Sequence, residues 1–558
     1  MNSEIRNCQN CKQNFTIEPE DFDFYQKIDV PPPTFCPDCR LQRRMMFRNE
    51  RALYNRKCDL CGAGIIAMYS PDKPFKVYCP KCFYSDKWDP MKYGRPYDPA
   101  KSFFAQMKEL MQEVPHLSLL QENAINSPWI NYELDSKNCY LNFGGQYNED
   151  SAYNQYALKA KDSFDNFWPM AGQFIYETTV AENGYKIFFS KLCFDCRETY
   201  FSFDCRNCVY VIGCTGLRHK QYHIFNKPVS KEEFERFLKD NLGSRTKVNA
   251  LKKKAQEFFR SQPQRALFID RSVDSTGNML ESCKNCKECW NTSKTEDSKW
   301  QFYSLEGRDS YDVFSVWKGE RCYDILGGSE AFNVRFTLGS LRQTSDVEYC
   351  YFAMNIHNSF GCVNLRNKKH CILNMQYTEM EYKKLRAEII ASMDENPYVD
   401  SKGRTFTYGG FFPYDLSLFG YNETVADEFF PLTYEEIRER GFNLGTFEAD
   451  QQSPSDYEVP DSIDVVRDDI LQKVLRCKAS GKVFRIIPME LQFYRRFNLP
   501  IPEYAPFERH HQRLQFISDH INLLERICGK CNKIIQSIYS ELEFPIVYCD
   551  DCYHHYVA

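Results

Sequence analysis

The chain has 558 residues, a formal net charge of −5 and 26 cysteines. This length allows several hydrophobic cores, and the negative charge argues against nucleic-acid attraction over the whole surface, so any such contact has to be local. The N-terminal stretch lacks a basic start followed by an apolar segment, and no apolar run reaches the length of a membrane span. We therefore expect a soluble cytoplasmic protein without membrane contact, whose cysteines stay reduced and bind metal.

Four CxxC pairs stand in the N-terminal segment. Each pair offers two thiolates from one tight turn, and two pairs about twenty residues apart provide the four ligands of a structural zinc site. The cysteines are Cys8, Cys11, Cys36, Cys39, Cys58, Cys61, Cys79 and Cys82. The spacing alone leaves sequential and cross-braced pairing of the four turns open.

The C-terminal end repeats this segment and decides between the two pairings. Cys8, Phe15 and Pro19 recur with unchanged spacing as Cys477, Phe484 and Pro488. In the copy, the first quartet has lost three ligands, whereas the second quartet is complete. Cross-braced pairing would have ruined both sites together, so we predict three structural zinc sites. They are Cys8/Cys11/Cys36/Cys39, Cys58/Cys61/Cys79/Cys82 and Cys528/Cys531/Cys549/Cys552.

The first module also carries a resemblance to a known family. Between its cysteine pairs stand Phe15, Phe24-Tyr25 and Pro33, and Arg40 follows the last cysteine. This run resembles the trcl-type zinc-ribbon family, and the whole arrangement resembles uncharacterised zinc-ribbon proteins of candidate phyla radiation bacteria. The resemblance implies a bacterial cytosolic protein and brings no established activity with it.

The stretch after Cys39 predicts a helix that leaves the first metal site. Its cations gather on one side, where arginine forks could hold phosphates and Tyr54 could stack on a base. The predicted nucleic-acid-binding residues are Arg40, Arg43, Arg44, Arg48, Arg51, Arg56 and Lys57. The alternative is an internal role, in which Arg40 and Arg44 pair with carboxylates of their own module, such as Asp21.

The middle of the chain repeats at intervals of twelve residues. Ser151 and Ser163 follow this interval in a first stretch, and Ser298 and Ser310 follow it in a second. A short fixed period of strand and turn is typical of a β-solenoid, whose coils bury their faces against one another. Each stretch ends in a capping box that predicts a closing helix. The boxes are Ser230 with Glu233 and Thr378 with Glu381.

Four cysteines of the middle follow the same interval. They are Cys193, Cys196, Cys205 and Cys208. They form either an interior ladder of small side chains or a fourth metal site.

The predicted fold class is multidomain and mainly β with α: a central duplicated β-solenoid-like region with helical caps, flanked by duplicated zinc-ribbon modules at both ends. The expected segments are 1–53, zinc-knuckle module with basic helix; 54–95, zinc ribbon; 96–116, linker helix; 117–228, β-solenoid half 1; 229–262, helical cap; 263–377, β-solenoid half 2; 378–460, helix, irregular connector and acidic linker; 461–520, degenerate zinc-knuckle module; and 521–558, C-terminal zinc ribbon.

We predict that the protein is not an enzyme, because the sequence has no nucleotide-binding, serine-hydrolase or zinc-protease motif and a four-thiolate site leaves no open zinc position. The predicted function is binding of structured nucleic acid, RNA or the ribosome, through the zinc-anchored basic helices. An alternative is a zinc-stapled scaffold that binds protein partners along the solenoid, and a third is a carbohydrate-active enzyme on a β-helix. The helix pair between Ser230 and Arg260 is a second basic surface.

Overall fold

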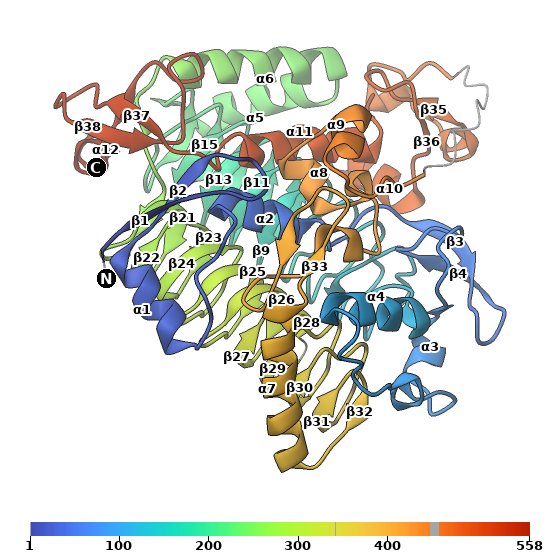
Figure 1. Cartoon of the computed structure of the whole chain (residues 1–558). Helices are drawn as coiled ribbons and strands as arrows, with labels where there is room; N and C mark the ends of the chain where they lie inside the picture. Colours follow the sequence, from blue (N-terminus) through green and yellow to red (C-terminus); the bar gives the residue numbers. More distant parts are fainter. Residues whose placement is uncertain (1, 341, 447–456, 558) are drawn as a thin grey trace. The chain divides into compact units, whose positions relative to one another are not determined.

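A computed structural model describes residues 2–340, 342–446 and 457–557 (Figure 1). These residues are mainly β, in several sheets, with helices between and around them. The chain forms two compact units, and neither is continuous in sequence: unit 1 comprises residues 1–119 and 268–446, and unit 2 comprises residues 120–267 and 447–558. The core of the predicted acidic linker, residues 447–456, lies outside the described residues.

Unit 2 contains parallel ladders whose partner residues are twelve apart in sequence. Gln173 pairs with Tyr185, and Lys191 pairs with Phe203. Single bridges carry the same register back to Ile125, which pairs with Lys137. The strands are β7 (Gln121–Glu122), β8 (Glu133–Leu134), β9 (Phe167–Met170), β10 (Gln173–Tyr176), β11 (Thr179–Glu182), β12 (Tyr185–Phe188), β13 (Lys191–Phe194), β14 (Arg197–Tyr200), β15 (Phe203–Arg206), β16 (Val209–Ile212), β17 (Gln221–Ile224) and β18 (Lys227–Pro228). The interval seen in the sequence is thus the register of pairing.

From Tyr132 to Phe225, a left-handed residue stands at every third position of this ladder. Asp135, Asn138 and Leu141 have φ angles of 50°, 52° and 49°. Asparagine and aspartate tolerate this conformation better than most residues, because their side chains bond the local backbone. Each interval of twelve residues therefore contains four left-handed residues, as at 135, 138, 141 and 144.

Unit 1 holds the second ladder, a 13-stranded sheet among the described residues. Its long strands keep the twelve-residue register, since Tyr311 pairs with Tyr323 and Val313 pairs with Ile325. The strands are β20 (Ile269–Asp270), β21 (Gly277–Glu281), β22 (Lys284–Lys287), β23 (Cys289–Ser293), β24 (Glu296–Phe302), β25 (Tyr311–Trp317), β26 (Tyr323–Ser329), β27 (Ala331–Arg335), β28 (Leu338–Ser340), β29 (Thr344–Glu348), β30 (His357–Phe360), β31 (Lys369–Ile372) and β32 (Met375–Gln376).

Each ladder ends in an antiparallel turn and a capped helix. In unit 2, the Ser230 hydroxyl accepts the Glu233 amide at the start of α5 (Lys231–Leu242), and α6 (Arg245–Arg260) follows. In unit 1, Thr378 does the same for Glu381 at the start of α7 (Glu379–Glu395). Phe234 of α5 and Tyr382 of α7 are buried. Both sequence-predicted capping boxes are observed.

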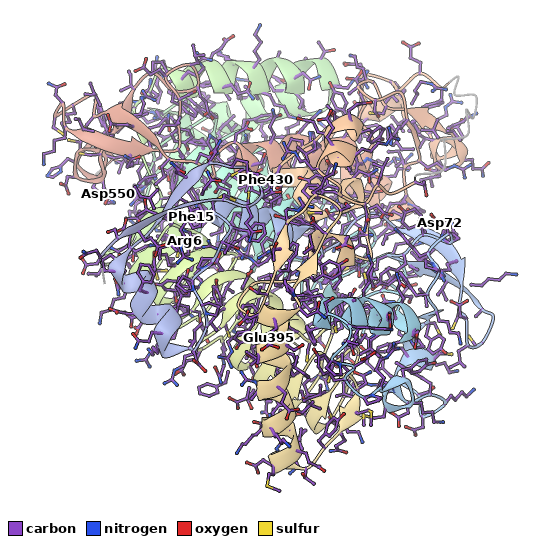
Figure 2. All side chains as sticks on the ribbon, in the orientation of Figure 1. Arg6, Phe15, Asp72, Glu395, Phe430 and Asp550 are labelled. Carbon is purple, nitrogen blue, oxygen red and sulfur yellow. The ribbon has the colours of Figure 1, made fainter. Side chains whose placement is uncertain are left out.

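The N-terminal modules belong to unit 1. The first consists of a hairpin, β1 (Glu4–Asn7) with β2 (Asn14–Ile17), and the helices α1 (Pro19–Lys27) and α2 (Pro37–Met45). Arg6 and Phe15 face each other across that hairpin (Figure 2). The second module contains β3 (Tyr54–Lys57), β4 (Gly64–Ala67), β5 (Val77–Tyr78) and α3 (Pro80–Phe83), and is joined by α4 (Phe103–Glu113) and β6 (His116–Leu117). Strand β5 pairs in parallel with β6.

The C-terminal modules belong to unit 2 and copy this plan. They contain β35 (Leu475–Arg476), β36 (Val483–Phe484), α10 (Pro488–Phe497), α11 (Pro506–Ser518), β37 (Leu524–Ile527), β38 (Ile534–Ser537), β39 (Val547–Tyr548) and α12 (Asp550–Val557). Strand β39 pairs in parallel with β19 (Gln264–Arg265), as β5 does with β6. Asp550, labelled in Figure 2, pairs with Arg265 at 2.6 Å.

The region after α7 completes unit 1 with short elements. They are β33 (Tyr398–Val399), β34 (Thr405–Phe406), α8 (Val425–Phe429) and α9 (Tyr434–Glu439). None of the described helices combines the length and the apolar character needed to cross a membrane.

Candidate metal centres and buried arginine clusters

The three predicted cysteine quartets come together in space. In each quartet the four sulfur atoms lie within 4.8 Å of one another. They are Cys8/Cys11/Cys36/Cys39, Cys58/Cys61/Cys79/Cys82 and Cys528/Cys531/Cys549/Cys552. In every quartet one pair lies in the turn of a two-stranded hairpin and the other lies at the start of a helix. The sequential pairing inferred from the duplication is therefore the pairing observed.

The sulfur spacing fits a tetrahedral ion. Four sulfurs at the zinc–thiolate distance of about 2.3 Å stand about 3.8 Å apart. Cys11 Sγ lies 3.7 Å from Cys36 Sγ, and Cys531 Sγ lies 3.8 Å from Cys549 Sγ. These four-thiolate groups can hold zinc, and such a site has no coordination position left for a substrate.

Backbone amides donate hydrogen bonds to the sulfur atoms and so stabilise the thiolate form. The amide of Cys79 donates to Cys58 Sγ at 3.3 Å, and that of Cys549 donates to Cys528 Sγ at 3.3 Å. Burial raises the pKa of each acceptor thiol, but the surrounding amides together lower it more, to about 7 for Cys58 and about 6 for Cys528. Thiolate is the form that binds metal.

The fourth candidate quartet is arranged differently. Cys193, Cys196, Cys205 and Cys208 are fully buried in the core of the unit 2 ladder. Each thiol donates to the carbonyl two residues before it, as Cys196 does to Phe194 at 3.2 Å. Among the described residues, ligand atoms that lie close enough together to hold a metal ion are found only in the three quartets above. Cys193 and Cys205 are ladder partners, so they stack along the interior.

The structure places the central members of the predicted phosphate-binding stripe inside the protein. Arg40, Arg43, Arg44 and Arg48 are buried, with exposed fractions of 1%, 1%, 0% and 5%. The predicted helix ends at Met45, so Arg48, Arg51 and Arg56 lie beyond it, and Arg56 belongs to strand β3. Of the seven predicted residues only Lys57 is exposed.

The arginines of α2 enter a carboxylate cluster on the unit 1 ladder. Arg40 pairs with Asp312 at 2.9 Å, and Arg44 reaches both Asp312 at 3.1 Å and Asp324 at 2.6 Å. Arg43 adds a contact to Asp324 at 3.3 Å. Burial by itself would lower the pKa of Arg40, but Asp312, Tyr25 and Tyr323 together raise it more, so the guanidinium stays charged. The sequence also predicted an internal role for Arg40 and Arg44, with carboxylates of their own module as partners. The observed partners lie on β25 and β26 instead.

Aromatic rings surround this cluster. The Arg40 guanidinium lies 4.6 Å from the centre of the Trp300 ring, and Phe24 of α1 stacks on Tyr311 at 3.8 Å. Tyr25 packs on Tyr323 at 5.4 Å. Helices α1 and α2 are therefore fixed to the ladder by both rings and charges.

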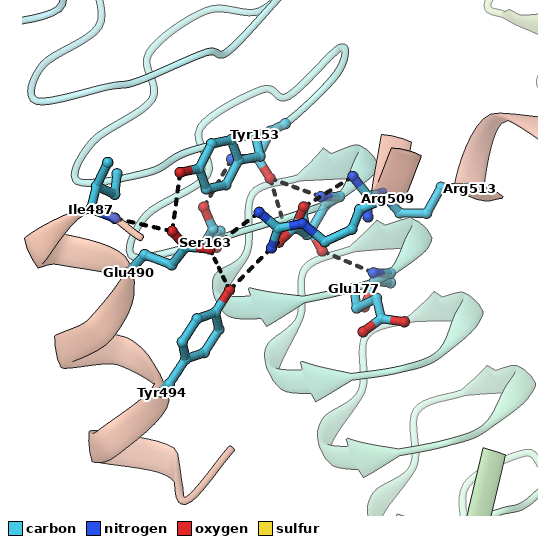
Figure 3. Close-up of polar contacts among 12 residues, drawn as sticks. Tyr153, Ser163, Glu177, Ile487, Glu490, Tyr494, Arg509 and Arg513 are labelled. Atoms are coloured by element: carbon cyan, nitrogen blue, oxygen red, sulfur yellow. Dashed lines mark hydrogen bonds and ion pairs between the residues drawn. The ribbon is translucent and has the colours of Figure 1, made fainter. Parts of the chain in front are cut away.

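Unit 2 repeats the same interface (Figure 3). Arg509 of α11 pairs with Asp165 and, at 3.2 Å, with Glu490, while Arg513 reaches Asp165 at 3.2 Å. The Arg509 guanidinium lies 4.8 Å from the centre of the Tyr153 ring, where unit 1 has Arg40 over Trp300. The Glu490 carboxylate also accepts the Tyr494 hydroxyl at 2.7 Å.

The acidic halves of both clusters were missed in the sequence, although the repeat contained the signal. Asp165 stands two residues after Ser163, as Asp312 stands two residues after Ser310, and those serines match in the internal repeat. A carboxylate kept at one position of a duplicated ladder, and two arginines kept in a duplicated module, predict a shared ion pair.

No protein-family model matches this chain, and no curated protein sequence matches it.

Proposed function

We propose that the protein is a non-catalytic scaffold in which zinc holds small modules against two β-solenoid halves and a protein partner binds to the assembled surface. The twelve-residue register and the left-handed residue at every third position support the solenoid interpretation. The four-thiolate chemistry of the three quartets supports structural zinc.

One observation carries this proposal: the arginines of both duplicated modules point into their own unit. Arg44 is fully buried between two aspartates in unit 1, and Arg509 occupies the corresponding cluster in unit 2. A phosphate cannot reach a guanidinium in that position without breaking buried ion pairs, which costs about 3–5 kcal/mol. The arginine-bearing helices α2 and α11 therefore fasten their modules to the ladders, α2 beside a cysteine quartet and α11 without one, and this favours the scaffold over binding of nucleic acid by these helices.

Purification without nuclease tests the scaffold. We expect the full chain to retain protein and no nucleic acid, and to retain it at high salt, because apolar contacts are not weakened by salt whereas phosphate contacts are. Retained nucleic acid that is lost steeply as salt rises would overturn the scaffold.

A second candidate, binding of RNA, rests on the outer face of α6. Lys247, Lys253, Lys254 and Arg260 are exposed there, and none of them makes an ion pair with another described residue. Four cations on one helix face could hold a phosphate backbone. Salt-dependent RNA binding that disappears when these four residues become glutamate would establish this candidate, and binding that survives the change would remove it.

A further inference from the structure

The solvent face of the C-terminal zinc ribbon carries an apolar pair. In the hairpin of β37 and β38, Ile527 lies directly opposite Ile534, and their exposed fractions are 64% and 71%. Side chains alternate along a strand, so the buried Arg526 and Ser537 occupy the other face, toward the ribbon's own core. Leu542, in the loop that follows, is 84% exposed.

The N-terminal ribbon has the same hairpin without these side chains. Lys57 and Gly64 occupy the positions of Ile527 and Ile534, with the same pairing between strands. Asp72 stands where the copy has Leu542. No large apolar side chain is exposed in residues 54–83, all of which the structure describes. Zinc and hairpin geometry therefore do not require an apolar pair at this place.

The turn between the two strands differs in the opposite way: the C-terminal ribbon has charged side chains where the N-terminal ribbon has apolar ones. Lys530 and Lys533 of the C-terminal ribbon replace Leu60 and Ala63 of the N-terminal one. Both lysines are exposed, and neither forms an ion pair within the described part of the chain. One ribbon thus combines two neighbouring isoleucines with two free cations, and its duplicate has neither feature.

We propose that this face, Ile527 and Ile534 with Lys530 and Lys533, binds a short extended peptide segment of a partner protein that carries aliphatic and acidic side chains. This inference rests on the scaffold proposed above and names one of its binding sites. The isoleucines would hold aliphatic side chains, and the lysines would pair with the flanking carboxylates. The hairpin is a two-stranded sheet, so a segment could also lie along an open strand edge.

The size of the face favours a segment over a folded partner. Stable association of two folded surfaces buries about 800 Å² on each partner. Two isoleucines on a four-residue hairpin offer much less than that. A linear segment needs only a few anchor side chains, and the resulting complex is weak and reversible.

A peptide titration tests the inference. The probe is a short fluorescein-labelled peptide that alternates leucine and glutamate, and fluorescence anisotropy measures its binding to the full chain. Two further peptides replace glutamate by lysine or leucine by serine. We expect the leucine–glutamate peptide to bind at least about tenfold more tightly than either of them.

Matched variants come from the duplicate ribbon. Ile527→Lys with Ile534→Gly installs the residues of the N-terminal ribbon and should weaken binding about tenfold or more. Lys530→Gln with Lys533→Gln should weaken it similarly and remove most of its salt dependence. The control, Lys57→Ile with Gly64→Ile, changes the N-terminal ribbon and should leave the affinity unchanged. Equal zinc content in all variants shows that the ribbons remain folded.

The outcomes separate the two proposals. Absence of binding, equal affinity for the three peptides, or unchanged affinity of the Ile527→Lys/Ile534→Gly variant overturns the peptide site. Two alternative occupants would also overturn it. One is a lipid surface, shown if anionic lipid vesicles bind in place of the peptide. The other is a second copy of the chain, shown if the Ile527→Lys/Ile534→Gly variant sediments as a smaller species than the parent. If the variant loses the peptide but still retains the protein partner in purification, the partner does not bind through this face, and the scaffold stands without it. If the peptide binds as expected but the chain retains only nucleic acid, the scaffold falls.

Discussion

Arg44 shows why arginine and not lysine stands at the buried cluster. Its planar fork reaches Asp312 and Asp324 at once, from two neighbouring strands of the ladder. A lysine ammonium is a single point charge without that geometry. Burying such a cluster gains little net stability, but leaving one of its members without partners is expensive. The cluster therefore specifies which surface the module meets more than it adds to total stability.

Arg44→Ala should strongly destabilise unit 1. The change leaves two buried carboxylates short of a partner, so we expect the free energy of unfolding to fall by about 3–5 kcal/mol. Urea titration followed by tryptophan fluorescence measures it. Lys57→Ala is the control on an exposed side chain of the same stretch, with an expected change within about 0.5 kcal/mol. Similar effects of the two changes would contradict the account of the cluster.

His116 gives unit 1 a dependence on pH. The ring is 1% exposed, and its Nε2 lies 2.6 Å from the Met111 carbonyl oxygen. Burial lowers the pKa of His116 to about 4 from an ordinary value of 6.5. The unfolded chain therefore takes up a proton that the folded chain refuses as the pH falls from 6.5 toward 4. Stability is fully present above this window and is lost through it, by up to about 3 kcal/mol.

Unit 2 supplies the variant that isolates this effect. Gln264 starts β19 as His116 starts β6, and its amide donates to the Phe259 carbonyl oxygen at 2.8 Å. His116→Gln should keep the hydrogen bond and lose the titration. We expect the variant to match the parent near pH 8 and to exceed its unfolding free energy at pH 4.5, as measured by urea titration at both pH values. Parallel pH curves for the two proteins would contradict this.

At the scale of elements, each of the two complete ribbon-like modules has too little structure for us to expect it to be stable without a metal ion in its cysteine quartet. Both hairpins have four-residue strands, and the helices that follow them, α3 and α12, have four and eight residues. Two-stranded hairpins of this length are marginal in water. Zinc binding contributes an apparent 10–16 kcal/mol or so in zinc-finger peptides, and this energy is coupled to folding.

Cysteine variants test the assignment of the three sites. Cys58→Ser with Cys61→Ser, and Cys528→Ser with Cys531→Ser, should each reduce the zinc content by one ion per chain, because two of four ligands are removed. Cys477→Ser is the matched control, since Cys477 is the single cysteine left in the degenerate module and is not part of a quartet. Elemental analysis of the purified proteins gives the answer. A loss of zinc in the control would show that the degenerate module binds metal.

Local patterns predicted the elements well, and long-range partners could not be predicted. The three quartets, the capping boxes at Ser230 and Thr378 and the twelve-residue interval all depend on residues close in sequence or on exact repetition. The end of α2 at Met45 was not predicted, because the cations after it continue a helical pattern. The burial of Arg44 was also missed, because its partner Asp324 is 280 residues away in the sequence. Charge along a helix does not reveal whether that face is covered.

For the whole molecule, the order of segments along the chain differs from their grouping in space. The N-terminal modules lead directly into residues 120–228, yet they share a unit with residues 268–446. The ladder they precede shares its unit with the C-terminal modules. The sequence does not show which ladder the N-terminal modules pack against, because Asp312 and Asp165 are equivalent positions of the duplication and either could have paired with the arginines of α2. Only the three-dimensional arrangement distinguishes the two pairings.

Removal of residues 1–119 should therefore damage the distant ladder and spare the adjacent one. Asp312 and Asp324 would lose their arginines, and Tyr311 would lose Phe24, so residues 268–377 should become sensitive to protease. Residues 120–228 keep Arg509 and Arg513 and should stay resistant. Limited proteolysis with mass spectrometry of the fragments distinguishes the two ladders.

The mirror truncation, which removes residues 457–558, should reverse the pattern. Asp165 would then lose both arginines, and residues 120–228 should become the sensitive segment while residues 268–377 stay protected. The two truncations are matched, because each removes one copy of the same duplicated modules and exposes one copy of the same carboxylate position. If each truncation instead exposed the ladder nearest to it in sequence, modules would fold with their neighbours and the two discontinuous units would be wrong. Opposite patterns in the two proteins would show that stability follows the ion-pair clusters and not the order of the chain.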